Sequence, residues 1–96
     1  MPVFIVAQLK FTDRERYNRY LAKFSGVFRK FDGKVVAAAE NPKVLEGDAG
    51  PDKIVVLEFP NEAAAQEFHN DPEYAEIALD RKGGTNGLVL QFEGIA

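Results

Sequence analysis

Two side chains toward the end of the sequence form the pattern with the clearest chemical use. Arg81 follows Tyr74 by seven residues, so the two share a face if this segment is helical. An arginine beside a tyrosine at the mouth of a pocket can hold a carboxylate through two parallel hydrogen bonds. The alternative role of Arg81 is structural, as a last-turn cation that satisfies helix carbonyl groups, and this role is the more common one.

Two glutamates are candidates for a general base. Glu58 lies within the apolar segment Lys53–Phe59, where strand alternation places it on one face with Ile54 and Val56. A carboxylate there is partly buried, so it either forms a structural ion pair or marks a pocket, and the sequence leaves both open. Glu46 lies in a turn-rich connector, where functional residues often occur, although a solvated acid is more common.

Three tyrosines and one histidine complete the set of candidates. Tyr17, Tyr20 and Tyr74 carry hydroxyl groups that need partners when buried; they either line a cavity between helices and sheet or simply fill the core. His69 ends a helical segment, where it is an acid or base, a lone haem ligand, or a water-facing residue favoured by the helix dipole. The water-facing role is the most common of the three.

The composition excludes several classes of function. The chain has 96 residues, which suits a single domain spanning residues 1–96. It has no cysteine and one histidine, which excludes thiolate and multi-histidine metal sites within one chain, and we expect neither a metal nor a cofactor. The net charge of −3 gives no attraction to nucleic acid or to an anionic membrane. The apolar run Val3–Ala7 is too short for a signal sequence or a membrane span, so we expect a cytoplasmic protein.

The first half of the chain has the pattern strand, helix, strand. Residues 3–10 are apolar on both faces at the start, which is typical of a central strand. Thr12 can cap a helix, and aromatic residues at three- and four-residue steps extend that helix to Phe31. Residues 34–39 form a second strand. A connector rich in turn residues follows over residues 41–52, and part of it could add a short strand.

The second half repeats the pattern. Residues 53–59 are again apolar on both faces. Asn61 caps a helix that runs to Phe68, and Asp71 caps a second helical segment with Pro72 at its first position. Residues 83–87 are predicted to form a glycine-rich turn, and residues 88–93 form the last strand.

The order β-α-β-β-α-β predicts a ferredoxin-like α+β fold. Right-handed crossovers give a four-stranded antiparallel sheet with the helices on one face and the first and third strands at its centre. The helix-free face then exposes several large apolar side chains, more than a monomer usually shows. We therefore expect a homodimer through this face; the alternative is a monomer whose connector, residues 41–52, folds over the sheet.

Several short motifs, taken together in their order and spacing, are similar to those of a known family. They are Thr12-Asp13 with Tyr17 and Tyr20, Phe31-Asp32-Gly33, Val44-Leu45-Glu46-Gly47, Val55-Val56-Leu57-Glu58-Phe59-Pro60, Ala64-Ala65 with Phe68, and Asp71-Pro72-Glu73-Tyr74 with Arg81. The sequence resembles the domain-of-unknown-function family 1330, within the dimeric α/β-barrel superfamily, over residues 3–94. The resemblance implies a ferredoxin-like homodimer with no established activity. The sequence departs from the family pattern at Asp32 and at Asn41-Pro42, where glycine is common.

The resemblance also implies a pocket. The matching positions are Tyr20, Glu46, Glu58, Tyr74 and Arg81. Superfamily relatives include cofactor-free monooxygenases and haem-degrading proteins, but the chain lacks a convincing version of their catalytic sets. We therefore expect a homodimer that binds or transforms a small, partly apolar metabolite between helices and sheet. The alternatives are a noncatalytic dimeric structural or regulatory module, and haem binding through His69.

Overall fold

Four antiparallel strands form one sheet in the computed structural model, which describes residues 1–95. The strands are β1 (Val3–Phe11), β2 (Lys34–Glu40), β3 (Lys53–Phe59) and β4 (Thr85–Glu93), in the order β2-β3-β1-β4. The central pair, β1 and β3, is the pair whose two faces are both apolar in the sequence. This arrangement confirms the predicted α+β, ferredoxin-like fold.

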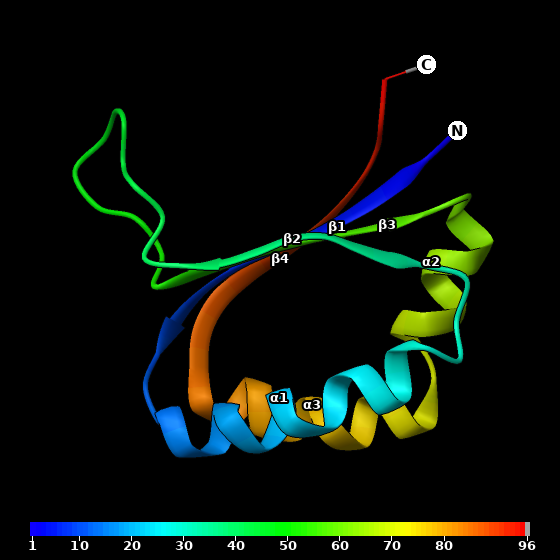
Figure 1. Cartoon of the computed structure of the whole chain (residues 1–96), viewed down its shortest axis with the longest axis horizontal. Coiled ribbons are helices and arrows are strands. Elements are labelled where there is room, and N and C mark those ends of the chain that lie inside the picture. Colours follow the sequence, from blue (N-terminus) through cyan, green and yellow to red (C-terminus); the bar gives the residue numbers. More distant parts are fainter. Residues whose placement is uncertain (96) are drawn as a thin grey trace.

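Three helices cover one face of this sheet (Figure 1). They are α1 (Arg14–Phe28), α2 (Glu62–His69) and α3 (Pro72–Gly84). The side chains of Asn61 and Asp71 cap α2 and α3 as predicted, each accepting a backbone N–H three residues later. At α1 the prediction of Thr12 as cap is wrong: the carboxylate of Asp13 accepts the N–H of Arg16 instead.

The predicted glycine-rich turn at residues 83–87 is also wrong. Helix α3 runs through Gly84, and β4 starts directly at Thr85. The carbonyl oxygen of Gly84 accepts hydrogen bonds from the N–H groups of Thr12 and Asp13, so the end of α3 is fixed against the start of α1. A Cβ atom at Gly84 would lie 2.7 Å from the carbonyl oxygen of Asp13. Glycine is therefore needed there for close backbone approach rather than for a turn.

The ends of two other elements differ from expectation. Helix α1 ends at Phe28 rather than at Phe31. The residues predicted as its last turn form a tighter turn instead, in which the N–H of Phe31 donates to the carbonyl oxygen of Phe28, three residues earlier. The connector of residues 41–52 contains no strand and projects beyond the sheet (Figure 1).

The core lies between the sheet and the helices, and Phe68 of α2 is its aromatic centre. This side chain is 1% exposed and packs against the rings of Phe28, Phe59 and Tyr74. Stacked and edge-on ring contacts stabilise such a cluster by more than the burial of its apolar area alone would. The end of the molecule near α2 is therefore tightly filled.

The other face of the sheet carries no helix, and its centre is apolar. The register places seven apolar side chains on it, at Phe4, Val6, Ile54, Val56, Leu88, Leu90 and Phe92. Leu90 is 46% exposed and Phe92 is 49% exposed, so the connector does not cover them. Among residues 1–95, no helix is long and apolar enough to cross a membrane.

Candidate functional site

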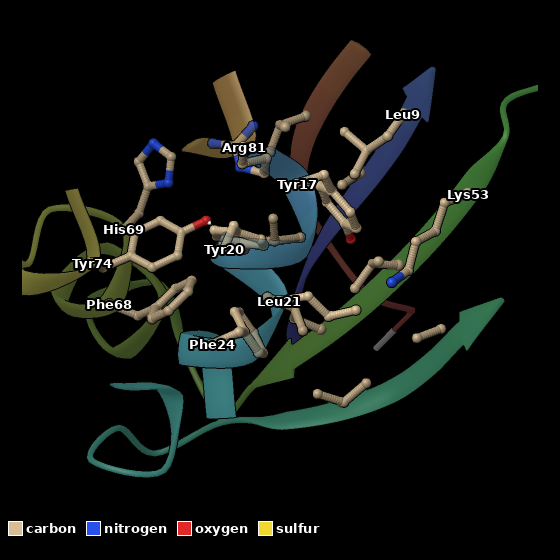
Figure 2. A pocket seen from close by; sticks show the side chains of 17 residues that line it. Leu9, Tyr17, Tyr20, Leu21, Phe24, Lys53, Phe68, His69, Tyr74 and Arg81 are labelled. Carbon is tan, nitrogen blue, oxygen red and sulfur yellow. Dashed lines mark hydrogen bonds between the residues drawn. The ribbon is translucent and has the colours of Figure 1, made fainter. Parts of the chain in front are cut away.

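A cavity of about 220 Å³ lies between the sheet and the helices (Figure 2). Its floor comes from the helix-facing side chains of the central strands, among them Ala7 and Val55, which are cross-strand partners. These side chains are small, so they leave space above the middle of the sheet. Protein cores rarely contain voids much larger than a water molecule, and a cavity of this size therefore needs a reason.

The wall opposite the sheet is aromatic and comes mainly from α1. Tyr17, Tyr20 and Phe24 follow one another along the helix at three- and four-residue steps, and neighbouring rings in this row lie 5.6–5.7 Å apart. Leu21 of α1 and Val35 of β2 both line the cavity and are both more than 40% exposed, so the cavity reaches solvent near them. A ligand can enter between α1 and the β2 edge of the sheet.

Tyr20 and Tyr74 meet at the cavity wall. Their hydroxyl oxygens lie 3.1 Å apart and share one hydrogen bond. Burial, reinforced by Tyr74, raises the pKa of Tyr20 above its ordinary value, so this hydroxyl stays protonated near neutral pH. Two phenols have two protons and use one in their mutual bond. The remaining O–H is free to donate to a ligand.

Arg81 lies beside this pair, as its sequence spacing from Tyr74 predicted. Its guanidinium carbon is 6.0 Å from the centre of the Tyr20 ring. Its Nε atom is buried and has no hydrogen-bond acceptor among residues 1–95. A buried charged donor without an acceptor is rare in proteins, since such groups lose their hydration without compensation.

Lys53 is the residue in this cavity that the sequence analysis missed. It is only 6% exposed, and its ammonium nitrogen lies 4.9 Å from the centre of the Tyr17 ring. A lysine at the start of a strand suggests a solvated edge. However, alternation groups Lys53 with Leu57 and Phe59, and the structure places this group on the helix side.

The carboxylate on the strand partner of Lys53 is already engaged. Glu40 is the β2 partner of Lys53, but its two carboxylate oxygens accept hydrogen bonds of 2.9 and 2.8 Å from Arg14. This bidentate contact holds the pKa of Glu40 below its ordinary value. Lys53 itself forms no salt bridge with any residue that the structure describes.

His69 also lines the cavity, from the end of α2. Its ring centre is 6.5 Å from that of Tyr74, and the side chain is exposed to solvent. It thus has the water-facing position favoured by the sequence and borders the cavity at the same time (Figure 2). Within residues 1–95, no three histidine or acidic side chains gather where they could hold a metal ion.

The structure brings Tyr20, Tyr74 and Arg81 together but places the two candidate glutamates elsewhere. Glu58 points to the helix-free face, opposite Phe4, where its carboxylate lies 3.9 Å from the ammonium of Lys34. Glu46 is exposed in the connector. Neither lines the cavity, so neither can act as a base on a molecule bound there. The cavity can instead donate hydrogen bonds and stabilise negative charge.

Comparison with known proteins gives a family and a fold. The sequence profile of the domain of unknown function DUF1330 matches residues 2–95. Comparison with curated proteins gave no significant match.

Three solved structures illustrate the fold. A protein of unknown function from Rhodopseudomonas palustris superposes with a TM-score of 0.83 at 22% identity, covering 99% of this chain and 83% of that one. A dimeric ferredoxin-like protein of unknown function from Jannaschia sp. CCS1 gives 0.80 at 11% identity, covering 98% and 100%. SnoaB, a cofactor-independent oxygenase from Streptomyces nogalater, gives 0.71 at 12% identity, covering 99% and 94%. At these identities the likeness shows the fold alone.

Proposed function

We propose, from the premise that this chain belongs to the DUF1330 family, that it is a homodimer that binds a small, partly apolar metabolite in the cavity of each protomer. The observation that carries the proposal is the cavity itself: about 220 Å³ of space with an aromatic wall, an opening to solvent and convergent polar groups. This combination is the usual form of a small-molecule site.

The residues around the cavity favour the interpretation that it is a binding site rather than a packing defect. The aromatic cluster around Phe68 fills the core densely at one end, while Tyr20, Arg81 and Lys53 are among the residues that line the empty space. A defect in an apolar core leaves a dry space lined by apolar atoms. Polar groups gathered around such a space are expected where a ligand supplies their partners.

The homodimer is supported by the apolar face and by related structures. Seven large apolar side chains lie on the helix-free face, and fully burying one that is exposed, such as Leu90, stabilises a complex by roughly 1.5–3 kcal/mol. The Jannaschia protein and a similar protein from Thermobifida fusca are both dimeric and ferredoxin-like. Light scattering is expected to give twice the chain mass of 10.7 kDa. A monomer at micromolar concentration would refute this part of the proposal.

A substitution that fills the cavity tests the binding function. Ala38 of β2 lines the cavity, so Ala38→Phe should block ligands without removing any polar group. Ala22 is exposed on α1, and Ala22→Phe is the matched control. Small carboxylic acids, amides and alcohols are screened by thermal shift. We expect stabilisation of the wild type and the control but not of Ala38→Phe. If no compound class stabilises the wild type, the noncatalytic dimeric module becomes the better account.

A further inference from the structure

We propose that the ligand of this cavity is a small organic anion, an apolar molecule that carries a carboxylate group; the proposal rests on the binding function proposed above and names its chemical class. The cavity wall holds three basic side chains, Lys53, His69 and Arg81, and no acidic one. The chain as a whole has a net charge of −3, so this local excess of positive charge is not a consequence of composition.

Several other cations of the protein have acidic partners, whereas the two cavity cations have none within residues 1–95. Arg16 and Arg19 both contact Asp80, and Lys34 lies near Glu58. Lys53 and Arg81 have no such partner among the described residues, although Lys53 is 6% exposed and Arg81 is half-buried with its Nε covered. A solvated surface lysine needs no partner, but a buried cation does. An anion bound in the cavity supplies it.

The two cations lie against neighbouring tyrosine rings of α1, and in the proposed complex one carboxylate would contact both. Lys53 packs over Tyr17, Arg81 packs over Tyr20, and these two rings are 5.6 Å apart. Figure 2 shows Lys53 reaching in from β3 and Arg81 lying beside the tyrosines of α1, so the two side chains reach the cavity from different elements. The guanidinium of Arg81 offers a planar fork that matches a carboxylate, whereas Lys53 acts as a point charge.

The hydroxyl pair adds a third donor. Because Tyr20 and Tyr74 share one hydrogen bond, one of their two phenolic protons is left to donate. The polar groups of the site are therefore mainly donors, and the rest of its lining is apolar. A carboxylate only accepts hydrogen bonds and can satisfy all of them, while an amine would be repelled and an amide would leave one donor group facing another.

The size of the cavity limits the apolar part of the ligand. A dry cavity of about 150 Å³ can hold a benzene molecule. The present cavity, at about 220 Å³, has room for one ring or a short branched chain together with its carboxylate. Phe24, Phe68 and Leu57 provide apolar contacts for that body. Benzoate is therefore a suitable probe, and benzamide is its neutral isostere.

The test is an NMR titration of the full chain with benzoate and, separately, with benzamide. The ¹H–¹⁵N signal of the Arg81 Nε–H group reports directly on the buried donor. We expect benzoate to shift this signal and to bind at least roughly tenfold more tightly than benzamide, since a hydrogen bond to a charged group contributes more than a neutral one.

Five variants test whether the selectivity comes from the two cations. Lys53→Met and Arg81→Met should each weaken benzoate binding by roughly 10- to 100-fold and leave benzamide binding unchanged. Lys23→Met and Lys82→Met remove exposed charges outside the cavity and should bind benzoate as the wild type does. Arg81→Lys keeps the charge and should recover part of the lost affinity.

The outcomes separate this proposal from the one on which it rests. If benzoate and benzamide bind equally and neither cavity variant matters, the anion proposal is overturned while the cavity remains a binding site. If neither probe binds the wild type at millimolar concentration, both proposals fail. If Lys53→Met does not fold, as judged by its melting curve, the Arg81 variants and the comparison of the two probes on the wild type decide the question.

Discussion

The two faces of the sheet differ in how their charged side chains are buried and paired, and β3 shows the difference most clearly. Lys53 and Glu58 both belong to β3, but Lys53 points to the helices and Glu58 points away from them. Lys53 is buried without an ion partner, whereas Glu58 is half-buried near Lys34. The helix side thus keeps a charge that has no salt bridge within residues 1–95, beside an empty space. The other side has a compensated charge at its margin and a broad apolar centre.

This contrast distinguishes a surface that suits a ligand from one that suits a second protein chain. Charge without a partner is unfavourable inside a protein unless something bound there compensates it. Exposed apolar area without charge is unfavourable in water unless another apolar surface covers it. Each of the following predictions tests one side of the contrast against the other.

The largest expected effect comes from removing an aromatic ring on each face. Phe68→Ala removes the centre of the core cluster, which is 1% exposed, and should lower the free energy of unfolding by about 3–5 kcal/mol. Phe92→Ala removes a ring that is 49% exposed on the helix-free face and should have a much smaller effect on the stability of the protomer. Urea unfolding over a range of protein concentrations measures both. Equal losses for the two variants would show that the faces do not differ in this way.

A charge at the centre of the helix-free face should separate the proposed dimer. Leu90 is the cross-strand partner of Val6, and Leu90→Lys places an ammonium group there in both copies. Losing two leucine side chains from the interface should weaken the dimer roughly 100-fold or more. Sedimentation measures the dissociation constant, and Lys82→Met, on the helix side, is the control. A variant that remains fully dimeric would place the interface elsewhere.

The hydroxyl pair on the helix side should contribute less. Tyr20→Phe removes one hydroxyl and leaves that of Tyr74 without its partner, at an expected loss of about 1–3 kcal/mol in the free energy of unfolding. Tyr74→Phe and the double variant complete a mutant cycle. If the two hydroxyls interact as the 3.1 Å distance indicates, the double variant loses less than the sum of the single ones. Strict additivity would mean that the pair does not interact.

The fold was predictable because the pattern of the central strands and the helix caps is local in sequence. Residues 3–10 and 53–59 are apolar on both faces, and Asp71-Pro72 starts a helix by short-range chemistry alone. The glycines at the end of α3 were misinterpreted because their reason is not local. Gly84 is needed because Asp13 lies against it, and Asp13 is far away in the sequence.

The candidate site was only partly predictable for the same reason. The spacing of Tyr74 and Arg81 on one helix is local information, and the structure places the two side chains together with Tyr20. Which face of β3 meets the helices depends on the packing of the whole sheet. Alternation alone therefore grouped Glu58 with Ile54 and Val56 without saying that this group lies away from the cavity. The burial of Lys53 depends on the same choice of face.

The smallest effect concerns the ion pair beside Lys53 and depends on pH. Arg14 lowers the pKa of Glu40 from its ordinary value of 4.5. A lowered pKa in the folded state means that the pair stabilises the protein above pH 4.5, and that this contribution is lost as the pH falls through the pKa of the folded state. Because both side chains are exposed, the contribution is small. The melting temperatures of the wild type and of Glu40→Gln should therefore differ slightly near neutral pH and converge on acidification. A difference that stays constant to about pH 3 would contradict this account.

The same ion pair keeps the cation of Lys53 available, which links it back to the contrast between the faces. Glu40 is the strand partner of Lys53, and its carboxylate is held by Arg14 at the edge of the sheet. Arg14→Gln should release that carboxylate toward Lys53, compensate the buried charge from within the chain, and so weaken benzoate binding. Glu40→Gln removes the competing carboxylate and should leave benzoate binding as tight as in the wild type or tighter. If the two variants have the same effect on benzoate binding, Lys53 does not provide the charge that the ligand needs.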